Sequence, residues 1–157
     1  MNWTTLTFGK YAGKSLPQVI FLDPDWFFWA CDKGTFGHYP SLRAEAEELY
    51  AKATSIRVPQ TGADAMLVEY NFYRDGGSAG FDLVPATRQE HQGSTGTMRL
   101  NRIDMSVPHR AKGYDKLGNR QFLRSVKSCV FGGPSARMSR ELCEAFFDDD
   151  TNFYANT

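Results

Sequence analysis

Hydrophobic positions follow different periods in the two halves of this 157-residue chain. Between residues 16 and 53, apolar segments lie between residues that typically start and stop helices. Residues 66–73 are instead rich in β-forming residues, and between residues 98 and 107 apolar and polar positions alternate, as in strands with one buried face. Helical spacing returns after residue 114. This order predicts an α+β fold, with a small N-terminal strand-turn-helical module followed by a small antiparallel sheet and two C-terminal helices.

Turn and capping residues divide the N-terminal segment. Residues 4–11 are predicted to form a strand, and Gly9 and Gly13 permit the backbone angles of a tight turn. Ser15 and Gln18 match a capping box, which starts a helix at the next position after Ser15. That helix must end near residue 22, because the residue before a proline is disfavoured in the helical region.

Two further helices follow in the first half. Asp23 is predicted to cap a helix with Pro24 at its first position, and Gly34 follows the end of that helix. Ser41 is predicted to cap a third helix over residues 42–53.

The second half begins with strand patterns. Residues 66–73 and 80–84 are predicted to form a hairpin across Gly76 and Gly77. Residues 98–107 are predicted to form a further strand with a bulge at residues 101–102, and Pro108 ends it.

Two C-terminal helices complete the pattern. The first is expected over residues 114–131, although Gly118 costs it ~1 kcal/mol relative to Ala. The second is capped by Ser139 and extends to residue 147. Residues 58–62, which include a proline and a glycine, are the predicted linker. They divide the chain into an N-terminal module (residues 1–57) and an α+β module (residues 64–157).

The net charge is zero, but the charges are unevenly distributed. Residues 141–157 hold five acidic residues and no basic one, a net charge of −5. Residues 97–140 hold ten basic residues against two acidic ones, a net charge of +8. Such segregation creates a local positive field.

Five of these basic residues recur at helical spacing: Lys112, Lys116, Arg120, Arg124 and Lys127. At 100° per residue, the last four occupy a sector of roughly 80° on the predicted helix. Like charges on one edge repel one another unless a negative partner lies against them. Nucleic-acid phosphate, an acidic protein and the acidic segment from residue 141 onward are the alternatives, beside a plain solvated face.

The aromatic segment at residues 26–29 also has two readings. Trp26 and Trp29 share one helix face, and aromatic side chains at helical spacing mostly belong to a core. A base-stacking platform would instead leave one of them exposed beside a basic residue. We expect these side chains to be core residues.

The glycine turn and the aromatic helix together resemble the C-terminal module of exodeoxyribonuclease X-like proteins. The shared features are a Phe-Gly-Lys-aromatic-x-Gly-Lys turn, here residues 8–14, and an Asp-Pro-x-aromatic helix that ends in Trp. The resemblance covers residues ~4–55, and the rest of the chain resembles no family. It implies a nucleic-acid context, in a bacterial or phage protein, without naming an activity. Lys10 and Lys14, beside the glycines, are then candidates for phosphate contact.

The residue spacings in this chain do not match catalytic or metal-binding motifs. The turn at residues 9–15 has three residues between its glycines, where a phosphate-binding P-loop needs four. Residues 77–83 are similar to the first motif of trimeric dUTPases, but the other dUTPase motifs are missing. The three histidines, His38, His91 and His109, have no second ligand at metal-binding spacing. No catalytic residue, cofactor or metal is predicted.

These observations favour a non-enzymatic, nucleic-acid-binding accessory protein that acts through phosphate contacts, with DNA favoured over RNA. The predicted contacts are Lys10, Lys14, Lys112, Lys116, Arg120, Arg124 and Lys127. A protein–protein adaptor or inhibitor, of phage or mobile-element origin, is the alternative, and an unrecognised enzyme is a third. Neither a signal peptide nor a membrane span is evident, and the three cysteines are widely spaced, so a cytoplasmic protein with reduced thiols is expected.

Overall fold

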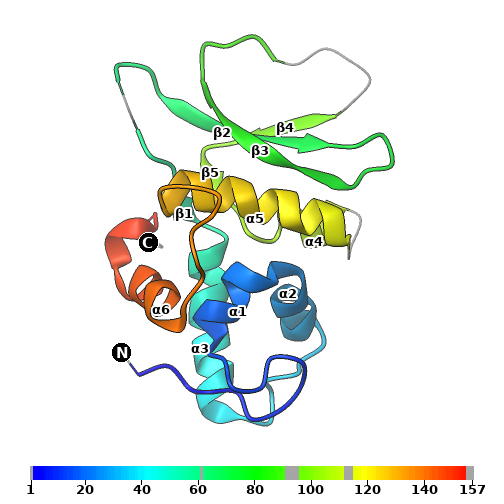
Figure 1. Ribbon diagram of the computed structural model, residues 1–157, viewed down its shortest axis with the longest axis vertical. Helices are drawn as coiled ribbons and strands as arrows, with labels where there is room; N and C mark the ends of the chain where they lie inside the picture. Colours follow the sequence, from blue (N-terminus) through cyan, green and yellow to red (C-terminus); the bar gives the residue numbers. More distant parts are fainter. Residues whose placement is uncertain (1, 61, 91–95, 112–114, 155–157) are drawn as a thin grey trace.

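A computed structural model describes residues 2–60, 62–90, 96–111 and 115–154, and it confirms the α+β class (Figure 1). The helices are α1 (Leu16–Leu22), α2 (Pro24–Asp32), α3 (Pro40–Ala53), α4 (Val107–Ala111), α5 (Lys116–Val130), α6 (Arg140–Asp148) and the 3-10 helix η1 (Asp150–Asn152). The strands are β1 (Ile56–Arg57), β2 (Met66–Phe72), β3 (Ser78–Pro85), β4 (Thr97–Leu100) and β5 (Arg102–Ile103).

The elements form three levels along the long axis of the molecule. An antiparallel sheet of order β3-β2-β4 lies at the top of Figure 1, α5 runs beneath it, and α1, α2, α3 and α6 lie below α5. The buried faces of β2 and β3 pack on α5 through Tyr70, Phe81 and Phe122, whose ring centroids lie 5.5–6.4 Å apart. The hairpin predicted across residues 76–77 is confirmed as the β2–β3 connection.

The predicted strand over residues 4–11 is wrong. The structure has only an isolated bridge between Thr5 and Ser15 there, supported by hydrogen bonds that Leu6 makes with Gly13 and Lys14. A longer strand does not form here, because the chain reverses at the glycine turn and only this one residue pair of the two arms is bridged. Gly9 has a φ of 76° and Gly13 a φ of 91°, so the predicted glycine turn is confirmed.

The helix boundaries follow the capping residues with two exceptions. Asp23 caps α2 as predicted, since its carboxylate accepts from the Trp26 N–H at 3.2 Å. Ser139 likewise caps α6 through the Leu142 N–H. The capping box at Ser15 is wrong: α1 begins after it, but its buried hydroxyl has no hydrogen-bond partner among the described residues. Gln18 instead donates to the Met138 carbonyl.

The other exception is the start of α3. The helix begins at Pro40, so Ser41 lies inside it and does not cap it. A proline at this position loses nothing, because the first N–H groups of a helix have no partner within the helix.

The predicted strand over residues 98–107 is confirmed only in its first half, where two short strands separate near the predicted bulge, and it is wrong after residue 103. The chain pairs with β2 as β4, separates from it, pairs with β1 as β5, and then forms α4 with Pro108 in its first turn. The Tyr70 hydroxyl holds the crossing, since it donates to the Arg102 carbonyl and accepts from the Asp104 N–H, both at 2.8 Å. Ile103, Met105 and Val107 are buried where this segment passes beneath the sheet, whereas Met98 is 39% exposed.

Contrary to the sequence prediction, the aromatic residues 26–29 are not all core residues. Phe27 and Phe28 are buried, but Trp29 is 44% exposed, so the core assignment of Trp29 is wrong. Trp26 is half-buried and packs against Tyr11, 5.2 Å away between ring centroids. The helix turns its phenylalanines toward the core, because they lie on the face that meets α1, α3 and α4.

One hydrophobic cluster extends through both predicted modules. α6, from the C-terminal half, packs on α1, where Phe147 lies 5.2 Å from Phe21 between ring centroids. Phe153 pairs with Ile56 of β1 as an isolated bridge. The division into residues 1–57 and 64–157 stays a prediction.

Gly118 has a packing role that helix propensity does not show. A Cβ added there would lie 2.5 Å from the Ser78 carbonyl oxygen, so only glycine lets α5 approach the start of β3 this closely. Propensity alone would make Ala ~1 kcal/mol better at this position. The clash with Ser78 outweighs the helix propensity of Ala, because the carbonyl oxygen belongs to the backbone of β3 and cannot move aside as a flexible side chain can.

We therefore predict that Gly118→Ala destabilises the protein by about 1–3 kcal/mol, as overpacking does. Gly133→Ala is the matched control, because an added Cβ there meets no atom within 4 Å, and it should stay within about 0.5 kcal/mol of wild type. Urea unfolding measures both. A Gly118→Ala variant more stable than wild type would contradict the close approach.

Candidate functional site

Four predicted contact residues lie on the outward face of α5. Phe122 and Val126 turn into the core, and Lys116, Arg120 and Arg124 are exposed on the other side, with Lys127 half-buried beside them. Lys112 lies outside the described residues. The predicted amphipathic helix with a basic edge is therefore present from Lys116 onward.

The four cations line one groove. It has a volume of about 260 Å³, lies between α5 and the end of α1, and is also lined by Leu22, Asn119 and Leu123. No hydrogen bond or ion pair joins the four cationic side chains to another described residue. We call this hollow the basic groove.

Three other basic residues between residues 97 and 140 form ion pairs or hydrogen bonds within the protein. Arg99 pairs with Glu69 at 2.8 Å, and Arg140 pairs with Glu144 at 2.6 Å. Arg102 donates to the Thr54 carbonyl at 3.1 Å. These three arginines are therefore bonded within the protein, whereas the cations of α5 are not bonded to any other described residue.

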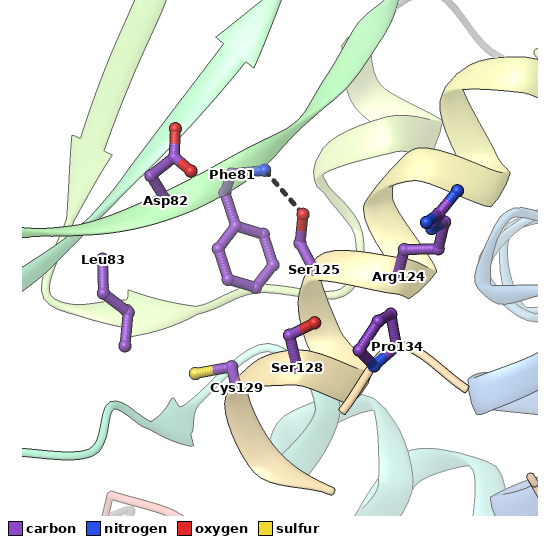
Figure 2. Close-up of a pocket in the computed structure, with 8 residues that line it drawn as sticks. All are labelled: Phe81, Asp82, Leu83, Arg124, Ser125, Ser128, Cys129 and Pro134. Carbon is purple, nitrogen blue, oxygen red and sulfur yellow. Dashed lines mark hydrogen bonds between the residues drawn. The ribbon is translucent and has the colours of Figure 1, made fainter. Parts of the chain in front are cut away.

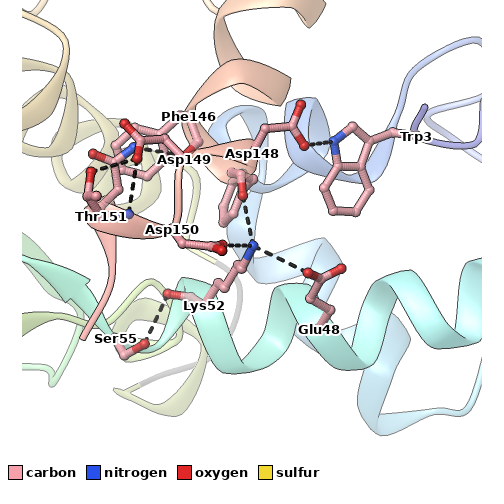
Figure 3. Close-up of polar contacts among 11 residues, drawn as sticks. Trp3, Glu48, Lys52, Ser55, Phe146, Asp148, Asp149, Asp150 and Thr151 are labelled. Carbon is pink, nitrogen blue, oxygen red and sulfur yellow. Dashed lines mark hydrogen bonds and ion pairs between the residues drawn. The ribbon is translucent and has the colours of Figure 1, made fainter. Parts of the chain in front are cut away.

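The acidic C-terminal segment does not neutralise the basic groove. Asp150 pairs with Lys52 of α3 at 3.0 Å, and Asp148 accepts from the Trp3 indole N–H, also at 3.0 Å (Figure 3). Lys52 also pairs with Glu48 and donates to the Phe147 carbonyl. Burial alone would lower the pKa of Lys52, but its hydrogen bonds to Asp150 and Glu48 raise that pKa overall.

The glycine turn lies apart from the basic groove. Residues 9–14 are at the lower end of the molecule in Figure 1, and α1 and α2 separate them from α5. Lys10 pairs with Asp23 at 3.7 Å, and Lys14 is half-buried. The structure therefore does not bring these two lysines together with the α5 cations.

A second hollow, of about 390 Å³, lies on the β3 side of α5 (Figure 2). Arg124, Asp82, Ser125 and Cys129 contribute polar or sulfur atoms to it. The Ser125 hydroxyl accepts from the Phe81 N–H and donates to the Gln121 carbonyl, so it joins strand to helix. Burial raises the pKa of the Cys129 thiol to about 11, which keeps it protonated and a poor nucleophile.

The other two cysteines have the same character. Burial, with a smaller effect of a neighbouring carboxylate, raises the pKa of Cys31 and of Cys143 to about 12. No group of three or more His, Cys, Asp and Glu side chains within the described ranges could hold a metal ion. None of the described helices is both long enough and apolar enough to cross a membrane.

His109 forms a cluster that sequence spacing did not reveal. Its Nδ1 lies 2.7 Å from Asp25 Oδ1 and its Nε2 lies 3.0 Å from Asp32 Oδ2, so the ring joins α4 to α2. Burial alone would lower the pKa of His109, but the two hydrogen bonds to carboxylates raise it overall. Asp25 and Asp32 are 84 and 77 residues away in sequence, so only the fold brings the three together.

Comparisons with protein-family models, with curated proteins and with solved structures found no match to this chain.

The His109 cluster gives a pH prediction. Because the folded-state pKa is raised, the stabilisation is fully present below the unfolded-state pKa of about 6.5 and is lost as pH rises through the folded-state value. His109→Gln should therefore cost about 1–2 kcal/mol at pH 6 and less at pH 9. Urea unfolding at both pH values measures the difference.

His38→Gln is the control, because His38 is exposed and makes no hydrogen bond to another described residue. It should leave stability unchanged at both pH values. A cost of His109→Gln that grows from pH 6 to pH 9 would contradict the charged cluster.

Proposed function

We propose that this protein binds nucleic acid through the outward face of α5, with the phosphate backbone as its ligand. The observation that carries the proposal is the basic groove, where four cations gather without an internal counter-charge among the described residues. Cations in that state lose little on binding a polyanion, because no internal ion pair has to break.

The spacing of the cations suits an extended anionic chain. Lys116 and Lys127 are eleven positions apart, which spans about 16 Å along a helix axis. Arg120 and Arg124 divide that length into steps of about one helical turn each. Each step is comparable with the distance between neighbouring phosphates of one strand, so several phosphates can be contacted at once.

Such contacts carry little sequence information. Lysine and arginine on a helix edge reach phosphate oxygens, whereas base readout needs donors and acceptors placed against base edges in a groove. We therefore propose an accessory role without base specificity. The resemblance of residues ~4–55 to the exodeoxyribonuclease X-like module supports DNA as the ligand, and contact by Lys10 and Lys14 stays a prediction.

Salt dependence tests this proposal. With four phosphate contacts, the log–log slope of affinity against salt on duplex DNA should be near −4, at about −0.9 per contact. The double change Arg120→Gln and Arg124→Gln should flatten the slope by about two units and weaken binding to all sequences alike. Fluorescence anisotropy at several salt concentrations measures both effects.

Lys33→Gln with Arg43→Gln is the matched control. Both residues are exposed on other helices or their ends, and removing them changes the net charge by the same amount. The slope should stay at its wild-type value in this control. Wild-type protein that binds no DNA or RNA at low salt would overturn the proposal and favour a protein partner for α5.

A further inference from the structure

We propose that a hollow beside the edge strand β4 binds a nucleotide whose base carries an exocyclic amino group, with Asp104 as the acceptor of that group. The hollow has a volume of about 350 Å³ and is lined by different residues from the basic groove. We call it the β4 hollow. The inference goes beyond the proposed function and does not depend on it.

The apolar wall of the β4 hollow is a part of the core face of the sheet that stays open. Met98 lies opposite Tyr70 in the β2–β4 ladder, and residues directly opposite each other share a face. Tyr70 is buried, whereas Met98 is 39% exposed and lines the hollow with the half-buried Leu100. The hollow lies within the 300–1,000 Å³ range of ligand pockets. Its apolar wall suits the flat body of a base.

Asp104 is the polar group of the hollow with unused hydrogen-bonding capacity. It is only 6% exposed, and its Oδ1 accepts from the N–H and the hydroxyl of Ser106 at 2.9 and 2.6 Å. Its Oδ2 has no hydrogen-bond partner among the described residues, and this oxygen is not fully buried, so a donor in the hollow can reach it. Because buried polar groups are nearly always paired, the free oxygen indicates a ligand that donates to it.

The carboxylate is also held in place before any ligand arrives. Ser106 fixes its Oδ1, and the Asp104 backbone N–H donates to the buried Tyr70 hydroxyl at 2.8 Å. A binding group whose own position is fixed by packing and hydrogen bonds loses little entropy when the ligand binds.

Two arginines of the same hollow define the charge of the ligand. Arg102 donates to the Thr54 carbonyl and Arg110 to the Tyr50 hydroxyl, and among the described residues neither forms an ion pair with Asp104. Two positive charges and one negative charge therefore border the hollow. They disfavour an ammonium group as the donor to Asp104. They favour a neutral N–H donor attached to an anion, which a nucleotide provides through its base and its phosphate.

The free acceptor distinguishes between bases. Cytosine presents an amino donor at N4, which carboxylates accept, whereas thymine and uracil present the O4 acceptor at the same position. A carboxylate repels that oxygen. In duplex DNA the amino group is already paired, so the hollow can bind a free nucleotide or an unpaired nucleotide of a strand, and the salt dependence on duplex DNA is unaffected.

The test is a titration of ¹⁵N-labelled protein with cytidine 5′-monophosphate and, separately, with uridine 5′-monophosphate, followed by NMR. The cytidine nucleotide should bind roughly tenfold more tightly, as a hydrogen bond to a charged acceptor allows. The largest amide shifts should fall within residues 98–111. Equal affinity for the two nucleotides, or shifts that leave these residues unchanged, would overturn the inference.

Variants assign the preference to the carboxylate. Asp104→Asn keeps an oxygen for Ser106 and places an amide NH₂ where Oδ2 was, so the preference should reverse in favour of the uridine nucleotide. Glu47→Gln is the matched control, because it removes the same charge at an exposed position of α3, and it should keep the wild-type preference. A preference for cytidine that survives in Asp104→Asn would contradict the role of this residue.

Arg110→Gln tests the other end of the ligand and serves if Asp104→Asn lowers the melting temperature. It should weaken binding of cytidine 5′-monophosphate about threefold or more and leave the affinity for cytidine, which has no phosphate, unchanged. Equal weakening of both ligands would show that the phosphate does not lie near Arg110 and would overturn the proposed pose.

Single-stranded 12-mers of dC and of dT, compared by fluorescence anisotropy, distinguish the two sources of the base. Tighter binding of the dC strand, with competition by cytidine 5′-monophosphate, supports an unpaired nucleotide of a strand. A nucleotide preference without a strand preference supports a free nucleotide. No preference in either assay overturns the inference while the proposed function stands. Failure of both strands to bind at low salt overturns the proposed function, whereas the titrations with nucleotides still decide this inference.

Discussion

The packing of α5 beneath the sheet decides which residues of this protein meet a ligand. Phe122 inserts between the level of the sheet and the helices, with its ring 5.5 Å from that of Phe81 and 6.4 Å from that of Tyr70. Gly118 allows the start of the helix to touch the backbone at Ser78. These contacts fix the rotation of the helix about its axis. Because a helix that buries one stripe exposes the opposite one, the basic residues must face outward.

The end of the same helix is held from the other side. Phe131, directly after α5, packs edge-on against Phe21 of α1 at 5.0 Å and lies 5.3 Å from Phe146 of α6. The helical level and the sheet therefore meet through α5. This arrangement also determines where the acidic C-terminal segment lies. Because α6 packs on α1, Asp150 after it lies within ion-pair distance of Lys52. A chain of zero net charge can thus keep a local positive surface, because its acidic residues are held on another face.

Local patterns in the sequence predicted much of this and failed where the fold acts at long range. Asp23, Ser139 and the hairpin glycines act within a few residues of themselves, so their elements were predictable. The strand expected over residues 98–107 divides into β4 and β5 and ends at residue 103, because Tyr70, more than thirty residues earlier, fixes the crossing there. Trp29 was misplaced because spacing gives a shared face but not which face is buried.

The basic edge of α5 was predictable from spacing alone, whereas its freedom from the acidic segment was not. Likewise, the His109 cluster depends on α4 packing against α2, and no spacing within the sequence indicates it.

A titration of ¹⁵N-labelled protein with a short single-stranded oligonucleotide, followed by NMR, tests most directly where the ligand binds. The largest amide shifts should fall within residues 116–127, together with the side-chain Nε–H signals of Arg120 and Arg124. Residues 148–152 should not move, because Asp148 stays bound to Trp3 and Asp150 stays bound to Lys52. Shifts that concentrate on the C-terminal segment, or that leave α5 unchanged, would contradict a free cationic surface on this helix.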